Sequence, residues 1–357
     1  MIKSNFEKVP LISQLSTIHL SLPTLMLTNM PILALSAILP GQEADIFVLM
    51  TVKEQLTTRE GKPYYRVGFR DGGREVVFPI WDNSPWAAEC RDKWTPGTFY
   101  KVRAVYRETN YGPQLDLRKI REVCDADAAD GFNPAVCQPQ SRYEPQRMFE
   151  EMLLIVRERI TDTALQSLVE RILIDNRDEL LRIPAARHNH HAFVAGWLEH
   201  TLSVTRTVIY LADKYAEYYD ELEPPLDKSM AVAGAILHDV GKLRELEQRP
   251  TGTVYTASGS LIGHLLQGRD IVRETVSACP LPPDTLLRLE HLIIAHQRLP
   301  EWGSPKPPMT PEALLVHYAD DIDAKFHMMA EVLRNDTSEG PLTSKKNALA
   351  QQVYRGE

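Results

Sequence analysis

The chain has 357 residues, of which 43% are hydrophobic and 25% are charged. These values are ordinary for a globular protein, and the length allows two domains. The formal net charge of −8 argues against a protein that coats nucleic acid with its whole surface, although a local basic groove remains compatible with it. The four cysteines include no CxxC pair, which disfavours a disulfide framework or a zinc-thiolate site and favours a reducing, cytoplasmic location.

Residues 1–43 are predicted to form an N-terminal extension that is partly disordered. Residues 11–39 are fairly apolar, but Ser, Thr, His and Pro interrupt them. A membrane span needs about 18 or more uninterrupted apolar residues, so no membrane association is expected. Glu7 weakens the segment as a signal peptide. Met30 is an alternative natural start, because residues 1–29 have no part in the predicted site.

Residues 44–123 are predicted to form a β-barrel. Asp-Gly-Gly at 71–73 is a turn signal, and Ser84-Pro85 opens a short helix that runs to about residue 93. Five apolar or alternating runs are typical of strands: residues 46–52, 64–70, 75–81, 99–107 and 114–120. Five strands with a helix between the third and the fourth are the layout of an OB-fold.

The composition changes after the barrel. Ala, Asp, Asn, Pro and Gln dominate residues 124–145, which are predicted to be a linker. Apolar residues then recur at three- and four-residue spacing over residues 146–337, which predicts helices without strands. Residues 338–357 are predicted to be a polar C-terminal tail. The predicted fold class is therefore α+β and multidomain, with a five-stranded OB-fold barrel followed by an all-α domain.

The pair His238-Asp239 is the strongest functional signal. It follows residues 230–237, which are apolar nearly all round and predict a buried helix. Burying a histidine beside an aspartate is costly unless something compensates them, and a divalent cation binds both neutral imidazole and carboxylate. Taken alone, a helix-ending pair satisfied by hydrogen bonds explains the motif about equally well.

Further candidate ligands fall on the apolar faces of predicted helices: His200, His264, His296 and Asp320. His200, for example, lies on the same helical stripe as Trp197. Each of these residues alone is more often a core residue satisfied by its neighbours than a ligand. Several helices that each direct a histidine or an aspartate inward around one His-Asp pair predict a metal site in a helical bundle.

The order of these residues resembles that of the HD superfamily of metal-dependent phosphohydrolases. Four runs are similar to those of the YhaM-type 3′–5′ exoribonucleases, namely His190-His191-Ala192-Phe193, Leu198-Glu199-His200-Thr201, the run from Ile236 to Lys242, and the run from Glu301 to Pro307. That family also places an OB-fold ahead of its HD domain. The resemblance extends over residues 44–335.

The resemblance implies two metal positions that share Asp239. One would be held by His200, His238, Asp239 and Asp320, and the other by His264 and His296. Two-metal HD enzymes often have His-His where this chain has His296-Gln297, so the second ion is expected to be held loosely or not at all. Manganese is the usual metal of the family, while the residue types alone also suit Fe²⁺, Co²⁺ and Ni²⁺.

Asp239 and Lys242 are the predicted catalytic residues. A bound cation lowers the pKa of its water towards about 7 and polarises a phosphoryl oxygen. Lys242 is placed to bind phosphate or to neutralise charge that develops on it, and an exposed helix-ending lysine is the alternative interpretation. His191 and Lys306 are weaker candidates for substrate contacts.

Three other residues near the motif are weaker candidates for a functional role. His188 and His190 are interpreted as surface residues. Asp323 lies three residues after Asp320 on roughly the same helical face, and it either supports the ligands or is solvated.

The barrel is the predicted nucleic-acid surface. Residues 50–123 contain 14 Lys and Arg against 10 Asp and Glu, a balance of +4 in a chain of net charge −8. Arg66 and Arg70 share a strand face, and Arg103 lies on another basic face. Aromatic residues at 64, 78, 81, 106 and 111 would stack on single-stranded bases. The alternative is that the aromatics form the barrel core and the cations a solvated face.

Together these features predict a 3′–5′ exonuclease that hydrolyses single-stranded RNA to nucleoside 5′-monophosphates. A wider substrate range would also include single-stranded DNA. The direction of digestion comes from the resemblance alone. The first alternative is an HD phosphohydrolase of free nucleotides or cyclic dinucleotides. The second is a non-catalytic nucleic-acid-binding module. A homo-oligomer is compatible with the sequence.

Overall fold

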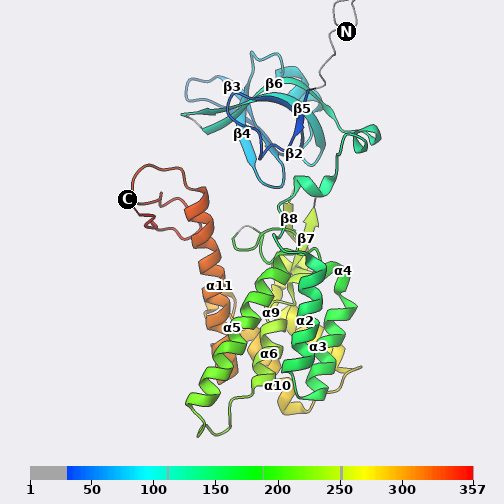
Figure 1. The fold of residues 1–357 in the computed structure, drawn as a ribbon, viewed down its shortest axis with the longest axis vertical. Helices are drawn as coiled ribbons and strands as arrows, with labels where there is room; N and C mark the ends of the chain where they lie inside the picture. Colours follow the sequence, from blue (N-terminus) through cyan, green and yellow to red (C-terminus); the bar gives the residue numbers. More distant parts are fainter. Residues whose placement is uncertain (1–29, 111, 188, 250–251, 357) are drawn as a thin grey trace, which may run out of the picture. The chain divides into compact units, whose positions relative to one another are not determined.

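The computed structural model describes residues 30–110, 112–187, 189–249 and 252–356. Residues 32–357 form one compact unit by their internal contacts. The disorder predicted within residues 1–29 lies outside the described residues, as do Tyr111 and His188. An antiparallel barrel comes first along the chain and a helical domain follows it (Figure 1).

Antiparallel strands form the barrel: β2 (Glu43–Thr57), β3 (Pro63–Arg70), β4 (Glu75–Trp81), β5 (Phe99–Thr109) and β6 (Gly112–Glu122). Their order in the sheet is β4-β3-β2-β5-β6, and contacts between β4 and β6 close the barrel. Helix α1 (Ala87–Lys93) connects β4 to β5. Because residues alternate across each strand, one face fills the interior with rings such as Phe69, Trp94 and Tyr100. The predicted OB-fold layout is confirmed.

The barrel begins earlier in the chain than residue 44. Strand β1 (Ile32–Leu33) pairs in parallel with β2, and Leu35 and Ile38 are fully buried in the barrel core. Asp71 accepts hydrogen bonds from the backbone N–H and the hydroxyl of Ser36 at 2.8 Å each. These contacts join positions 35 residues apart, so local pattern did not predict them.

Residues 124–145 contain more structure than the predicted linker. Two 3₁₀ turns, Asp125–Ala128 and Pro134–Cys137, lie within them. The carboxylate of Asp127 is 2% exposed and accepts hydrogen bonds from both terminal nitrogens of Arg121, at 2.6 Å each. The Sγ of Cys137 donates to the carbonyl of Phe47 in the barrel at 3.7 Å. The segment is therefore attached to the barrel rather than free.

Helices dominate the remainder of the described chain: α2 (Pro145–Arg159), α3 (Thr163–Asp175), α4 (Arg177–Leu180), α5 (Gly196–Tyr218), α6 (Lys228–Leu237), α7 (Lys242–Glu245), α8 (Ala257–Ile262), α9 (His264–Val276), α10 (Pro283–Ala295) and α11 (Pro311–Asn335). Helix α6 is the central one, in contact with α2, α3, α5, α10 and α11. This explains why residues 230–237 are apolar on every side.

Two segments differ from the predicted all-helical domain and polar tail. A hairpin of β7 (Leu246–Arg249) and β8 (Gly252–Tyr255) follows α7. Strands of four residues are too short for alternation to reveal them. In the tail, Leu342 pairs with Tyr354, and Thr343 and Val353 are buried. The tail is therefore packed in part, although most of it is polar.

Candidate metal centre

The predicted ligands lie at the ends or on the inner faces of helices that surround α6. His238 and Asp239 follow α6 directly, His264 opens α9, and His296 follows the last residue of α10. The backbone must pass closely here: a Cβ on Gly241 would lie 1.9 Å from the carbonyl oxygen of His264. Glycine after the His-Asp pair therefore allows α9 to bring His264 up to Asp239.

Each of the four candidate imidazoles is oriented through its Nδ1 atom. In His238 this atom lies 2.7 Å from the carbonyl oxygen of Ala235, and in His296 it lies 2.8 Å from that of Ile293. A carbonyl only accepts, so Nδ1 carries the proton in both rings. The remaining two rings use carboxylates: the Nδ1 of His200 faces Asp323 at 2.8 Å, and that of His264 faces Glu245 at 2.9 Å.

The Nε2 atoms that remain converge on two carboxylates. Asp239 divides its oxygens between two pairs of rings, with Oδ2 at 3.7 Å from the Nε2 of His238 and 3.9 Å from that of His200. Its Oδ1 lies 3.2 Å from the Nε2 of His264 and 3.6 Å from that of His296. Asp239 could therefore offer one oxygen to each of two cation sites.

Asp320 closes the cluster from α11. Its Oδ1 lies 3.2 Å from the Nε2 of His200 and 3.9 Å from that of His238. Its Oδ2 lies 3.9 Å from the Nε2 of His296. Ligand atoms of His200, His238 and Asp320 lie within 4.8 Å of one another, and so do those of His238, Asp239 and His296. The six predicted ligands are thus brought together.

The cluster fits a divalent cation better than it fits a hydrogen-bonded core. Among the described residues, the buried Oδ1 of Asp239 and the buried Nε2 of His296 have no hydrogen-bond partner. The Nε2 atoms of His200 and His238 lie 3.3 Å apart, a hydrogen bond that requires a proton on one of the two atoms, although both Nδ1 atoms already carry one. Buried acceptors that face one another without donors are costly, and imidazole nitrogen with carboxylate oxygen is a donor set for borderline divalent metals.

The electrostatics of the cluster also favour positive charge. Burial lowers the pKa of His238 to about 4, which keeps this ring neutral, as a ligand must be. Burial also works to lower the pKa of His200, but hydrogen bonds and charge from Asp320 and Asp323 outweigh it and raise that pKa to about 10. The carboxylates that would stabilise a cation thus stabilise a proton on His200 in the ion-free protein.

Lys242 and Gln297 lie beside the second pair of rings. The Nζ of Lys242 lies 3.1 Å from Glu245 Oε2, and its side chain is 12% exposed. Burial works to raise the pKa of Asp239, but Lys242 and nearby imidazoles hold it well below its usual value. The amide nitrogen of Gln297 lies 3.2 Å from the Nε2 of His264. Gln297 therefore adjoins the site where the resemblance implied a weaker second ion.

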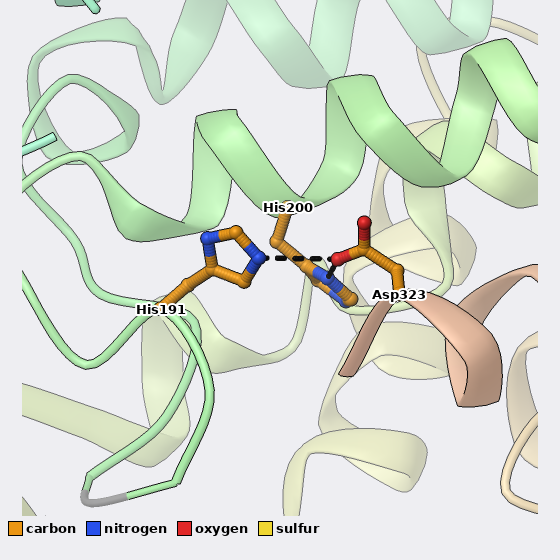
Figure 2. Close-up of side chains that lie close together, drawn as sticks. All are labelled: His191, His200 and Asp323. Carbon is orange, nitrogen blue, oxygen red and sulfur yellow. Dashed lines mark hydrogen bonds and ion pairs between the residues drawn. The ribbon is translucent and has the colours of Figure 1, made fainter. Parts of the chain in front are cut away.

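The loop before α5 reaches the cluster with two histidines. His191 is buried, and its Nε2 lies 3.1 Å from Asp323 Oδ2 (Figure 2). The ring of His190 lies 5.0 Å from that of His200 between centroids, and burial lowers its pKa to about 3. His190 is thus half-buried beside the cluster rather than simply solvated. Its position depends on a loop without periodicity, so only the resemblance of the run His190-His191-Ala192-Phe193 marked it in the sequence.

Lys306 lies in an exposed loop after the 3₁₀ turn Pro300–Trp302. Its predicted substrate contact stays a prediction. The same loop approaches the cluster at Gly303, where a Cβ would lie 3.5 Å from Leu265, the neighbour of His264.

Of the three predicted cations of the barrel, Arg66 and Arg103 have carboxylate partners. Arg103 forms two hydrogen bonds with Asp45, at 2.7 and 2.9 Å. Arg66 lies 3.1 Å from Glu54, and Arg70 is partly buried. The basic balance of the barrel therefore does not translate into a row of unpaired charges.

Aromatic side chains of the barrel separate into two groups. Phe78 and Tyr106 are 5% and 3% exposed and belong to the core. Tyr64 and Trp81 pair across β3 and β4, with ring centroids 5.2 Å apart, and Trp81 is 44% exposed. The second pair forms an aromatic platform on the outer surface.

No helix in the described part of the chain is long and apolar enough to cross a membrane. The barrel has a likeness to the second OB-fold domain of replication protein A from Methanococcus maripaludis, with 12% identity over 26% of this chain and 94% of that one, and a TM-score of 0.21. Residues 197–325 match the model of the HD domain. This match spans His200, His238-Asp239, His264, His296 and Asp320. The helical part of the chain therefore carries an HD domain over residues 197–325.

Proposed function

We propose that the protein is a metal-dependent 3′–5′ exonuclease that hydrolyses single-stranded RNA, and also single-stranded DNA, to nucleoside 5′-monophosphates. One observation carries the hydrolytic part: four imidazoles anchored at Nδ1 direct their Nε2 atoms at two carboxylates, one of which has a buried oxygen without a partner. The direction of digestion and the polymeric substrate rest on the resemblance to YhaM-type exoribonucleases.

The residues of the chain divide the work of phosphodiester hydrolysis. His200, His238, Asp239 and Asp320 would hold one cation, and His264 and His296 would complete a second site with Asp239. A cation bound there supplies water activated near neutral pH and a sink for phosphoryl charge. Manganese is the proposed metal, with Fe²⁺, Co²⁺ and Ni²⁺ as alternatives.

Lys242 serves this site mainly through its charge. Its ammonium group keeps Asp239 ionised, and it is held by Glu245. The ammonium has three donors and Glu245 engages it at one oxygen, so a direct contact from Lys242 to the phosphate stays a prediction. His191 is better placed as a support for Asp323 than as a substrate contact.

The barrel would present the strand by stacking rather than by charge. Tyr64 and Trp81 form an exposed aromatic surface, and bases stack on such surfaces without regard to sequence. The pairing of Arg66 and Arg103 with carboxylates leaves less positive charge for phosphates. We therefore propose Tyr64 and Trp81 as the principal single-strand contacts of the barrel.

The pairing of Arg66 and Arg103 with carboxylates favours one alternative, an HD phosphohydrolase of free nucleotides or cyclic dinucleotides, because such an enzyme needs no strand-binding surface. A non-catalytic binding module is the less favoured alternative, because the candidate ligand set is complete. Cytoplasmic location and a homo-oligomer stay predictions.

Digestion of an end-labelled oligonucleotide tests the proposal. With Mn²⁺ present, the purified protein should shorten single-stranded RNA from its 3′ end, and a 3′-terminal phosphorothioate should slow the reaction. A chelator should stop it. Turnover of free or cyclic nucleotides with an intact oligonucleotide would establish the alternative, and absence of both reactions would favour a binding module.

A further inference from the structure

Asp323 lies behind the metal cluster and contacts three side chains at once. Its Oδ2 lies 2.8 Å from the Nδ1 of His200 and 3.1 Å from the Nε2 of His191, and its Oδ1 accepts a hydrogen bond from the hydroxyl of Ser203. Figure 2 shows dashed lines from the carboxylate to both imidazoles, which come from the loop before α5 and from α5 itself. Asp323 itself belongs to α11.

The contact between Asp323 and His200 determines which nitrogen of the His200 ring carries a proton. An ionised carboxylate only accepts hydrogen bonds, so the ring atom that faces it must carry a proton. The proton on Nδ1 leaves the Nε2 of His200 for the cluster, where it lies 3.2 Å from Asp320. In metal sites, a carboxylate in this position orients the ring and increases its basicity as a ligand.

Asp323 is held firmly enough to act in this way. The carbonyl oxygen of His191 accepts from the N–H of Ala185 at 3.1 Å, and a Cβ on Gly196 would lie 1.9 Å from it, so only glycine fits there. The ring of His191 also packs on that of His327, with centroids 4.0 Å apart. The loop therefore places the Nε2 of His191 against Asp323, which cannot rotate away without losing that partner.

Asp323 differs from the other groups that orient the ligands. His238 and His296 are oriented by main-chain carbonyls, which no substitution removes. Glu245 orients His264 but also forms an ion pair with Lys242, so its removal would have two effects. The described contacts of Asp323 are to His200, His191 and Ser203, of which only His200 belongs to the six predicted ligands, although ligand atoms of His191, His200 and Asp323 also lie within 4.8 Å of one another.

We propose that Asp323 is a positioning residue, which holds His200 in the tautomer and orientation that bind the first metal ion. His191 and Ser203 hold Asp323 in turn. The inference rests on the proposed metal centre but not on the identity of the substrate. Loss of the carboxylate should weaken metal binding while the fold and the RNA-binding surface stay intact.

Calorimetric titration of Mn²⁺ into the ion-free full-length protein tests this proposal. Asp323→Asn keeps the size of the side chain and one acceptor oxygen but loses the charge, and it should weaken Mn²⁺ binding about 10-fold. Asp323→Ala also loses the acceptor and should weaken it towards about 100-fold. In Asp323→Asn, saturating Mn²⁺ should restore most of kcat, with KM for RNA unchanged. A purely structural role would not give that recovery.

Asp321→Asn is the matched control. It removes the same charge from the same helix, but Asp321 pairs with Lys325 at 2.8 Å, and its Mn²⁺ affinity should equal that of the unchanged protein. Folded Asp323→Asn with unchanged Mn²⁺ affinity would overturn the proposal. If the unchanged protein binds Mn²⁺ but digests no RNA, the exonuclease proposal fails and the role of Asp323 stands. If it binds no divalent metal, both fail.

Discussion

The HD domain and the barrel differ in whether their polar side chains find partners within the fold. In the HD domain, histidines and aspartates are buried with acceptors facing acceptors, and Asp239 and His296 keep polar atoms without partners. In the barrel, several cations pair with carboxylates within the fold, as Arg103 does with Asp45 and Lys101 with Asp130.

The difference shows where a ligand is required. A cluster of unsatisfied acceptors is stable only if something positive enters it, whereas a set of paired charges is complete without a partner. The HD cluster is therefore the stronger evidence for function, and the barrel contributes through its exposed aromatic rings. Substitutions in the two regions should therefore differ in what they change.

The largest effect is expected from Asp239→Asn. The amide loses the negative charge and replaces one of the two carboxylate oxygens by a donor, so one candidate ion position loses a ligand, the other keeps only a neutral one, and the rate of hydrolysis should fall by more than about 100-fold. Initial rates with Mn²⁺ and labelled oligonucleotide measure this, with circular dichroism to verify the fold. Asp213→Asn, which breaks an exposed ion pair with Lys228, should change the rate by less than about two-fold. Equal rates for the two variants would show that Asp239 is not part of the metal site.

Trp81→Ala should have the next largest effect, on binding rather than on chemistry. Loss of a stacking surface is worth about 1–3 kcal/mol per base, so the affinity for single-stranded RNA should fall by about 5- to 150-fold. Fluorescence anisotropy with labelled RNA measures it. The matched control is Tyr210→Ala on α5, since Tyr210 is 67% exposed and should leave affinity unchanged. An unaffected Trp81→Ala protein would exclude the aromatic platform.

Asp127→Asn should destabilise the barrel and its attached segment in a pH-dependent way. The hydrogen bonds from Arg121 hold the pKa of Asp127 well below its usual value. Its contribution is therefore present above about pH 4 and is lost as the pH falls through the lowered pKa of the folded state. At pH 7 the variant should lose about 1–3 kcal/mol of unfolding free energy.

Urea unfolding at pH 7 and pH 3 measures this difference. The gap in unfolding free energy between Asp127→Asn and the unchanged protein should narrow at pH 3, because Asp127 of the unfolded chain, with a pKa of about 3.9, is then mostly protonated while the native carboxylate is still ionised. A gap of the same size at both pH values would show that the charge of Asp127 is not what stabilises this segment.

The smallest effect is expected from Arg103→Ala. Because Arg103 is already paired with Asp45, RNA affinity should change by less than about three-fold and its salt dependence should stay the same. Binding isotherms at several salt concentrations provide the test. A decrease in the logarithmic salt slope of about 1 would mean that Arg103 neutralises a phosphate, and the contrast between the two regions would then be weaker.

The metal cluster could be predicted from helical spacing, because the spacing of apolar residues is a local property that shows which side chains face inward. His200 lies on the buried stripe of α5, and the apolar run before His238 indicates a central helix, so the inward direction of these side chains follows from the periodicity. No period predicts the two 3₁₀ turns within residues 124–145, the hairpin or the position of His190. Contacts with distant residues determine them.

Net charge was a poor guide for the barrel for the same reason. Arg103 and its partner Asp45 are 58 residues apart, and no local pattern shows which cations are paired. Alternation also places Phe78 and Trp81 on different faces of β4, but it does not decide which face is inside. The structure was needed to separate Trp81 on the surface from Phe78 in the core.

Metal content tests the central claim most directly. The purified protein, loaded with Mn²⁺ and dialysed, should retain about one to two ions per chain by elemental analysis. His238→Ala, with its fold verified, should retain markedly less. A protein that retains no divalent metal, or a His238→Ala variant that retains as much as the unchanged protein, would contradict the metal centre.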